Sequence, residues 1–253
     1  MSECWAFLNV ESYLKHIYAT AIIWERILSK YYLNSVKRIL GTNEDLVKIA
    51  ILYHDLGKLT KEYREGNRRL FRHEIIGAYL AYKNYNNLYL SLAILLHHEP
   101  FILGIYAGSI GEKFITLSTL RRIIEKSDLS IYCDLTKDPW YNKSKEIYNN
   151  KLDEVVKNLN SINKEDIYNK LKEIVIKSSI STNELLEVRI KVAALLYPLT
   201  LVDSLAALFT RKDSNDAGTW ITKRALDDDP RAEIPKRNEI YDLLIKEKLI
   251  EGY

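Results

Sequence analysis

Five histidines and two aspartates in this chain form a pattern that could bind metal ions. His54 is followed directly by Asp55, and a second pair, His97 and His98, ends an apolar segment. Two adjacent imidazoles at the end of a buried helix need polar partners, and a metal ion would supply them. The remaining candidates stand alone in the sequence: His16, His73 and Asp203. Imidazole and carboxylate groups together suit Mn, Fe, Co, Ni or Zn.

Each of these residues also has a structural explanation that needs no metal. His16 lies on the apolar side of its expected helix, where a hydrogen-bonded core histidine is more common than a ligand. A histidine at a helix N-terminus, as expected for His73, is common. His97 and His98 could hydrogen-bond to loop backbone. Asp203 would lie on an apolar helix face, which is costly for a carboxylate unless an arginine or a metal ion pairs with it.

Apolar residues recur at helical spacing along most of the chain, so helices are expected to carry the candidate residues. Asn9 is expected to cap the first helix, and Gly41 closes the region that follows it. The other expected helices cover approximately residues 43–53, 73–84, 88–96, 117–130, 143–160, 164–178, 183–210 and 236–249. Loops are expected at 59–72, 101–113 and 211–235. His97 would therefore end a helix, and Asp203 would lie inside one.

The composition is that of a helical globular protein. Of 253 residues, 47% are hydrophobic and 28% are charged, and only 9 Gly and 5 Pro are available for turns. We interpret the chain as one all-α domain over residues 1–253, with a core at 9–210 and a C-terminal extension at 211–253. Cys4 and Cys133 are too few for a disulfide scaffold. No secretory signal is recognised and the apolar stretch 192–209 falls short of a bilayer span, so a cytoplasmic protein without a membrane partner is expected.

The ordered set of five histidines and two aspartates resembles the HD superfamily of metal-dependent phosphohydrolases, a helical fold named for its adjacent His and Asp. The resemblance implies an HD-type helical bundle with irregular loops and a C-terminal helix. It also implies a first metal site formed by His16, His54, Asp55 and Asp203. A second site would add His73, His97 and His98, with Asp55 bridging both ions.

Two divalent ions are the implied cofactors: Mn, Ni, Co, Fe, Zn or Mg. A pair of ions about 3.5–4 Å apart can generate hydroxide and stabilise an in-line phosphoryl displacement. The resemblance assigns catalytic roles to Asp55 and Lys58, the latter as the cation that steadies phosphate charge. Lys58 is also explained as a lysine favoured at a helix C-terminus by the helix dipole.

The segment after this motif is locally basic. Residues 58–72 contain six basic and two acidic residues, a local charge of +4 against +3 for the whole chain. A basic loop beside a phosphohydrolase site favours a phosphodiester backbone as substrate, although a solvated surface loop is an equally good explanation. The candidate nucleic-acid contacts are Arg64, Arg68, Arg69 and Arg72, and the candidate base-stacking residues are Tyr63, Phe71 and Tyr106.

Within the superfamily, the order of the histidines looks like the stand-alone HD nuclease of type I CRISPR systems. Single-metal nucleotidases lack the additional histidines, and no Gly-Tyr-Pro follows His97-His98-Glu99 as in cyclic-dinucleotide phosphodiesterases. This resemblance implies metal-dependent cleavage of single-stranded DNA, with RNA as a further substrate. Since the chain has no P-loop motif, a separate helicase subunit would act in trans beside an RNA-guided CRISPR complex. The alternatives are a phosphohydrolase of nucleotides or cyclic dinucleotides and a degenerate module that only scaffolds a complex.

Overall fold

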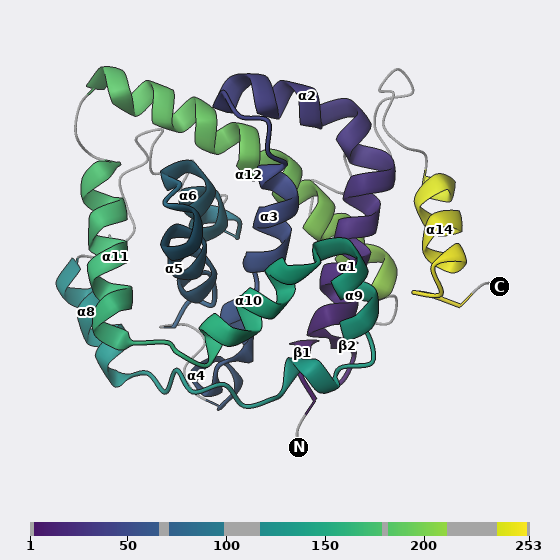
Figure 1. The fold of residues 1–253 in the computed structure, drawn as a ribbon, viewed down its shortest axis with the longest axis horizontal. Coiled ribbons are helices and arrows are strands. Elements are labelled where there is room, and N and C mark those ends of the chain that lie inside the picture. Colours follow the sequence, from purple (N-terminus) through teal and green to yellow (C-terminus); the bar gives the residue numbers. More distant parts are fainter. Residues whose placement is uncertain (1–2, 66–70, 99–116, 179–181, 212–236, 252–253) are drawn as a thin grey trace.

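The fold is a bundle of helices (Figure 1). The computed structural model describes residues 3–65, 71–98, 117–178, 182–211 and 237–251. Helices occupy most of these ranges, so the prediction of an all-α fold is confirmed. The helices are α1 (Tyr13–Ile23), α2 (Ser29–Leu40), α3 (Leu46–Tyr53), α4 (Lys61–Glu65), α5 (Glu74–Tyr85), α6 (Leu88–Leu96), α8 (Leu117–Lys126), α9 (Tyr141–Tyr148), α10 (Asn150–Leu159), α11 (Lys164–Lys177), α12 (Thr182–Thr210) and α14 (Arg237–Lys246). Three short segments complete the set: a π-helical turn η1 (Trp24–Leu28) and the 3₁₀ turns η2 (Leu56–Leu59) and η3 (Leu135–Lys137).

The N-terminus differs from the expected helix. Residues Trp5–Phe7 (β1) and Glu11–Ser12 (β2) form a small antiparallel ribbon instead. Asn9 does not cap a helix; it lies in the turn of the ribbon with φ of 58°, a conformation that asparagine adopts more easily than most residues. Ser12 is the actual cap, because its hydroxyl accepts a hydrogen bond from the Lys15 backbone N–H at 3.3 Å. α1 therefore begins at Tyr13.

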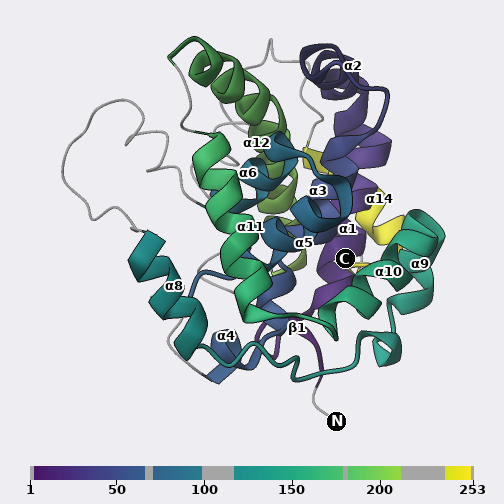
Figure 2. The same cartoon turned by 60° about the vertical axis from the view of Figure 1, so that its left-hand side comes forward.

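The centre of the bundle is formed by α1, α3, α5, α6 and α12. α5 packs against α6, and α12 packs against α1, α2, α3 and α6, an arrangement that is visible from two directions (Figures 1 and 2). Except for Ala6, the buried apolar side chains of the described residues belong to one cluster. α3 and α6 are apolar on all sides, as expected for helices that are enclosed by others.

α12 is the longest described helix and crosses the whole bundle (Figure 1). Contrary to the expectation from sequence, its part Leu185–Thr210 is long and apolar enough to cross a membrane. However, 67% of that apolar window is buried inside the protein. The apolar character of α12 is thus accounted for by packing against the other helices of the bundle.

Several helix boundaries agree with the sequence, and one expected helix is broken. α6 and α11 begin at the predicted residues because Asn87 and Asn163 cap them. The helix expected at 143–160 is divided into α9 and α10 at Asn149, whose φ is 51°. The last helix, α14, covers Arg237–Lys246, close to the expected range. The loops expected at 101–113 and at most of 211–235 lie outside the described residues.

A disulfide joins the first strand region to the segment after α8. Cys4 and Cys133 are bonded, with their Cα atoms 5.4 Å apart and a sequence separation of 129. No spacing in the sequence indicates that these two cysteines pair. The bond holds the N-terminal ribbon, from which α1 starts, against the chain that leads into α9.

Candidate metal centre

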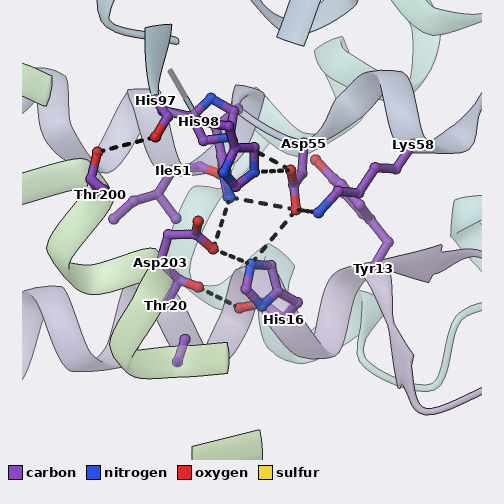
Figure 3. Close-up of polar contacts among 12 residues, drawn as sticks. Tyr13, His16, Thr20, Ile51, Asp55, Lys58, His97, His98, Thr200 and Asp203 are labelled. Atoms are coloured by element: carbon purple, nitrogen blue, oxygen red, sulfur yellow. Dashed lines mark hydrogen bonds and ion pairs between the residues drawn. The ribbon is translucent and has the colours of Figure 1, made fainter. Parts of the chain in front are cut away.

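Elements far apart in sequence bring the predicted ligands together (Figure 3). His16 comes from α1, His54 ends α3, His73 precedes α5, His97 ends α6, and Asp203 comes from α12; Asp55 and His98 directly follow two of these histidines. Two groups form, His16, His54 and Asp203 in one and Asp55, His73, His97 and His98 in the other, each with its potential ligand atoms within 4.8 Å of one another. Every metal-ligand candidate from the sequence is therefore in one of two adjacent groups.

Asp55 faces both groups at once. Its Oδ2 lies 3.7 Å from His16 Nε2 and 3.6 Å from His54 Nε2. Its Oδ1 lies 3.1 Å from His73 Nε2 and 3.7 Å from His97 Nε2. One carboxylate thus turns a different oxygen to each group, which is the geometry that a bridging ligand requires.

In the first group, Asp203 is the carboxylate nearest to the histidines. Its Oδ1 is 2.9 Å from His16 Nε2 and 3.6 Å from His54 Nε2. α12 brings Asp203 to this point, and the Tyr13 hydroxyl holds α1 against α3 by donating to the Leu52 carbonyl at 3.0 Å. The cost of a carboxylate on an apolar helix face is offset here by the two imidazoles.

In the second group, a glycine permits the approach of the chain to His73. A Cβ atom on Gly57 would lie 2.0 Å from the His73 backbone oxygen, so η2 and the start of α5 can touch only if this residue has no side chain. His98 is the most exposed member of the group, with 38% of its side chain accessible and its Nε2 4.0 Å from Asp55 Oδ1. His98 therefore lies on the side of the centre that a substrate can reach.

Backbone carbonyls orient two of the histidines. His54 Nδ1 donates to the Ile51 carbonyl at 2.7 Å, and His97 Nδ1 donates to the Ile94 carbonyl at 2.6 Å. Because a carbonyl can only accept, each Nδ1 carries the proton and each Nε2 keeps its lone pair. Both Nε2 atoms face Asp55, so both rings present the ligand form of imidazole to the centre.

Unsatisfied polar atoms show that the centre fits metal ions. Among the described residues, His54 Nε2, His73 Nε2, His97 Nε2 and Asp55 Oδ1 are buried and make no hydrogen bond. Buried polar atoms without partners are rare in native proteins, and each needs an explanation. These four belong to the predicted ligand set, whereas two further atoms of this kind, Asp138 Oδ2 and the Tyr148 hydroxyl, do not. Imidazole nitrogen with carboxylate oxygen is the donor chemistry of divalent transition-metal ions.

The electrostatics favour ionised carboxylates. Burial would raise the pKa of Asp55, but Lys58 and then His54 outweigh it and hold this pKa well below its usual value. Burial would also raise the pKa of Asp203, but the imidazoles of His16 and His54 hold this pKa well below its usual value. Lys58 is buried as well, and Asp55 raises its pKa, so the ammonium stays charged. Burial would lower the pKa of His16, but Glu11 and then Asp203 raise it to about 9. Near neutral pH the centre therefore contains two ionised carboxylates, the Lys58 ammonium and a charged His16 imidazole.

The predicted nucleic-acid contacts are only partly described. Arg64 lies over the Tyr132 ring, 5.4 Å from its centre, and Arg72 donates to Glu74 at 2.7 Å. Arg68, Arg69 and Tyr106 lie outside the described residues. Phe71 is completely buried, so the prediction that it stacks on bases is wrong. Tyr63 lies beside the centre, with its ring 5.1 Å from the His73 ring.

Two buried glutamates were missed by the sequence analysis. Glu11 and Glu74 are each 1% exposed and lie within ion-pair distance of His16 and His73, respectively. Burial would raise the pKa of Glu11, but His16 and then Arg211 lower it to about 2. Glu74 directly follows His73 in the sequence, which was an available signal, whereas the approach of Arg211 to Glu11 depends on the fold.

Comparison with known families places this centre in a defined class. The family model described as "HD domain" matches residues 13–152, which is more than half of the chain. The chain therefore belongs to the HD domain family, and the resemblance seen in the histidine pattern is confirmed.

The curated relatives narrow the comparison within this family. The chain is similar to proteins named "CRISPR-associated endonuclease Cas3-HD" from three organisms. Identity to the Thermoproteus tenax protein is 43% over 127 residues, which is 49% of this chain and 55% of the relative. Identity to the Methanocaldococcus jannaschii protein is 29% over 225 residues, covering 79% of this chain and 87% of the relative. The Pyrococcus furiosus protein is 31% identical over 124 residues, covering 40% of this chain and 52% of the relative. The matches thus span about half the length of two relatives and most of the third.

Proposed function

We propose that this chain is a metal-dependent nuclease that hydrolyses phosphodiester bonds of single-stranded DNA, and also of RNA, in CRISPR interference. The observation that carries the proposal is the position of Asp55, whose two oxygens face two separate groups of histidines. The names of the three relatives support the nuclease activity and its CRISPR context.

In this proposal the centre holds two divalent ions, Mn, Ni, Co, Fe, Zn or Mg. His16, His54 and Asp203 would hold one, His73, His97 and His98 would hold the other, and Asp55 would contact both. When bound, such ions supply Lewis-acid activation of water and neutralise charge on a phosphoryl group. The fixed Nδ1 protons of His54 and His97 keep both rings aimed at the centre before any ligand arrives.

The other residues of the centre position the substrate. Lys58 is the buried cation closest to Asp55, and we assign to it the stabilisation of negative charge on the phosphate. Access from the side of His98 would admit a flexible strand. The basic residues Arg64, Arg68, Arg69 and Arg72 would guide its backbone toward the centre.

The proposal also includes partners and location. A separate helicase subunit and an RNA-guided complex would deliver the single strand to this chain in the cytoplasm. Such delivery would suit a nuclease whose candidate nucleic-acid contacts lie in one short segment, 58–72.

Cleavage of a labelled single-stranded oligonucleotide by metal-stripped protein tests the proposal. Mn, Mg, Ni, Co, Fe and Zn are added back separately, with Asp55→Ala measured beside the wild type. We expect metal-dependent fragments that disappear in the variant while its far-UV circular dichroism is unchanged. Retained cleavage by Asp55→Ala would contradict the bridging role. Absence of cleavage with every metal, together with hydrolysis of a cyclic dinucleotide or nucleotide, would favour the small-molecule alternative.

A further inference from the structure

Glu11 is a buried carboxylate with a specific position behind one of the predicted ligands. It belongs to β2, and its Oε2 lies 3.3 Å from His16 Nδ1, the ring nitrogen that points away from the centre. The other nitrogen, His16 Nε2, faces Asp203 and Asp55. The His16 ring therefore lies between the Glu11 carboxylate and the centre.

The end of α12 holds Glu11 in this position. Thr210 donates its hydroxyl to Glu11 Oε1 at 2.5 Å, and Arg211 donates Nε–H to Glu11 Oε2 at 2.6 Å. The Arg211 guanidinium also comes within 3.4 Å of His16 Nδ1. Both carboxylate oxygens are thus engaged, and the helix that supplies Asp203 also fixes the residue behind His16.

Glu74 stands in the same relation to the second group. Its Oε2 lies 3.5 Å from His73 Nδ1, while His73 Nε2 faces Asp55. Arg72 donates two hydrogen bonds to Glu74, from Nη2 to Oε1 at 2.7 Å and from Nε to Oε2 at 3.3 Å. Like Glu11, Glu74 is almost completely buried and is held by an arginine that does not itself belong to the ligand set.

Four of the five histidines, all but His98, therefore fall into two pairs by the group behind the ring. His54 and His97 have neutral backbone carbonyls behind Nδ1, whereas His16 and His73 have carboxylates. Each predicted ion would be bound by one histidine backed by a carbonyl and one backed by a carboxylate. A carboxylate behind an imidazole fixes its tautomer and increases its basicity toward a metal, and loss of such a partner typically lowers metal affinity about 10- to 100-fold.

We propose that Glu11 and Glu74 are positioning residues, one for each metal ion, that hold His16 and His73 in the ligand orientation and strengthen their bonds to the ions. Arg211 and Arg72 keep the two carboxylates in place. This inference rests on the proposed metal centre but not on the identity of the substrate. It also assigns to Arg72 a role in positioning Glu74, which is separate from contact with nucleic acid.

The test is metal binding by the whole chain, without substrate. Metal-stripped wild type, Glu11→Gln and Glu74→Gln are titrated with Co²⁺, following the visible absorption of the bound ion, and bound metal is counted by mass spectrometry. We expect wild type to bind two ions, and each variant to bind one ion as before and the other about 10- to 100-fold more weakly. Glu247→Gln is the matched control, because this half-buried glutamate accepts a hydrogen bond from Tyr18 and contacts no histidine in the described structure.

Folding and positioning effects are separated by a second variant. Since Glu11→Gln removes the carboxylate to which Arg211 Nε–H donates, the double variant Glu11→Gln/Arg211→Gln removes this partly buried cation as well. We expect the double variant to recover melting temperature but not Co²⁺ affinity. Equal Co²⁺ affinities in wild type and variants, or recovery of affinity together with melting temperature, would overturn the inference. A wild type that binds no metal would instead overturn the proposed function.

Discussion

Lys58 Nζ lies 2.6 Å from Asp55 Oδ2, the same carboxylate oxygen that faces His16 and His54. The ammonium and a metal ion in the first group would therefore share one oxygen and repel each other. The positive charge of Lys58 therefore repels a metal ion in the first group and can attract an incoming anion, such as a phosphate. A lysine that served only to favour a helix terminus would not need to be buried against the central carboxylate.

Replacing Lys58 by methionine should consequently separate binding from chemistry. Removal of the competing charge should leave Mn²⁺ affinity unchanged or higher, while the single-turnover rate of oligonucleotide cleavage should fall about 100-fold or more. Calorimetry and a quenched-flow assay measure the two quantities. Lys61→Met, which changes an exposed lysine on the adjacent α4, should alter neither. An unchanged cleavage rate in Lys58→Met would make Lys58 a structural lysine.

A methyl group at position 57 should damage the second metal group selectively. The Cβ atom of Gly57→Ala would overlap the His73 backbone carbonyl, so η2 and α5 would have to move apart. We expect a loss of about 1–3 kcal/mol in the free energy of unfolding and loss of the ion bound by His73. Gly41→Ala is the control, because this residue has φ of 67° but open space around it. The control should cost about 1 kcal/mol and keep both ions.

Neutralising Arg68 and Arg69 should weaken polymer binding. The double alanine variant should bind a single-stranded oligonucleotide less tightly. Its affinity should also depend less steeply on salt concentration, by the amount that corresponds to about one to two phosphate contacts. Hydrolysis of a small phosphodiester should be unaffected. Arg38→Ala provides the comparison, since α2 lies at the opposite end of the bundle from α4 (Figure 1). Equal losses for polymer and small substrate would show that the basic segment has a structural role.

Breaking the disulfide should reduce stability strongly because the bond closes a long loop. Cys4→Ser/Cys133→Ser should lower the free energy of unfolding by about 2–5 kcal/mol, given the sequence separation of 129 between the two cysteines. Urea denaturation measures the difference. Reductant should destabilise the wild type by a similar amount and leave the double variant unchanged. A wild type that is indifferent to reductant would show that the pair contributes little in solution.

The sequence was most informative where a single residue type determines local structure. α6 and α11 begin at the expected residues, 88 and 164, and the side chains of Asn87 and Asn163 cap their first turns. The break at Asn149 was missed because it lies within a continuous polar helical pattern. The strands were missed because a ribbon of two or three residues per strand has too few residues to show an alternating pattern.

The ligand set could be found from the sequence because histidine is rare in this chain and four of the ligands form two adjacent pairs, His54-Asp55 and His97-His98. The groups behind the ligands could not be found in this way. Glu11 and Arg211 are 200 residues apart, and only the packing of α12 on α1 brings them together. The sharing of the two oxygens of Asp55 between the groups is likewise a property of side-chain orientation.

The hydrogen bonds of His54 and His97 also constrain how this protein can diverge. Each ring is fixed to the carbonyl three residues earlier, at the last turn of α3 or α6. One inserted or deleted residue before either histidine would rotate its position by about 100° around the helix axis and turn the imidazole away from Asp55. We therefore expect insertions and deletions in related sequences to occur in loops away from these two helix ends. α3 and α6 should keep their number of residues.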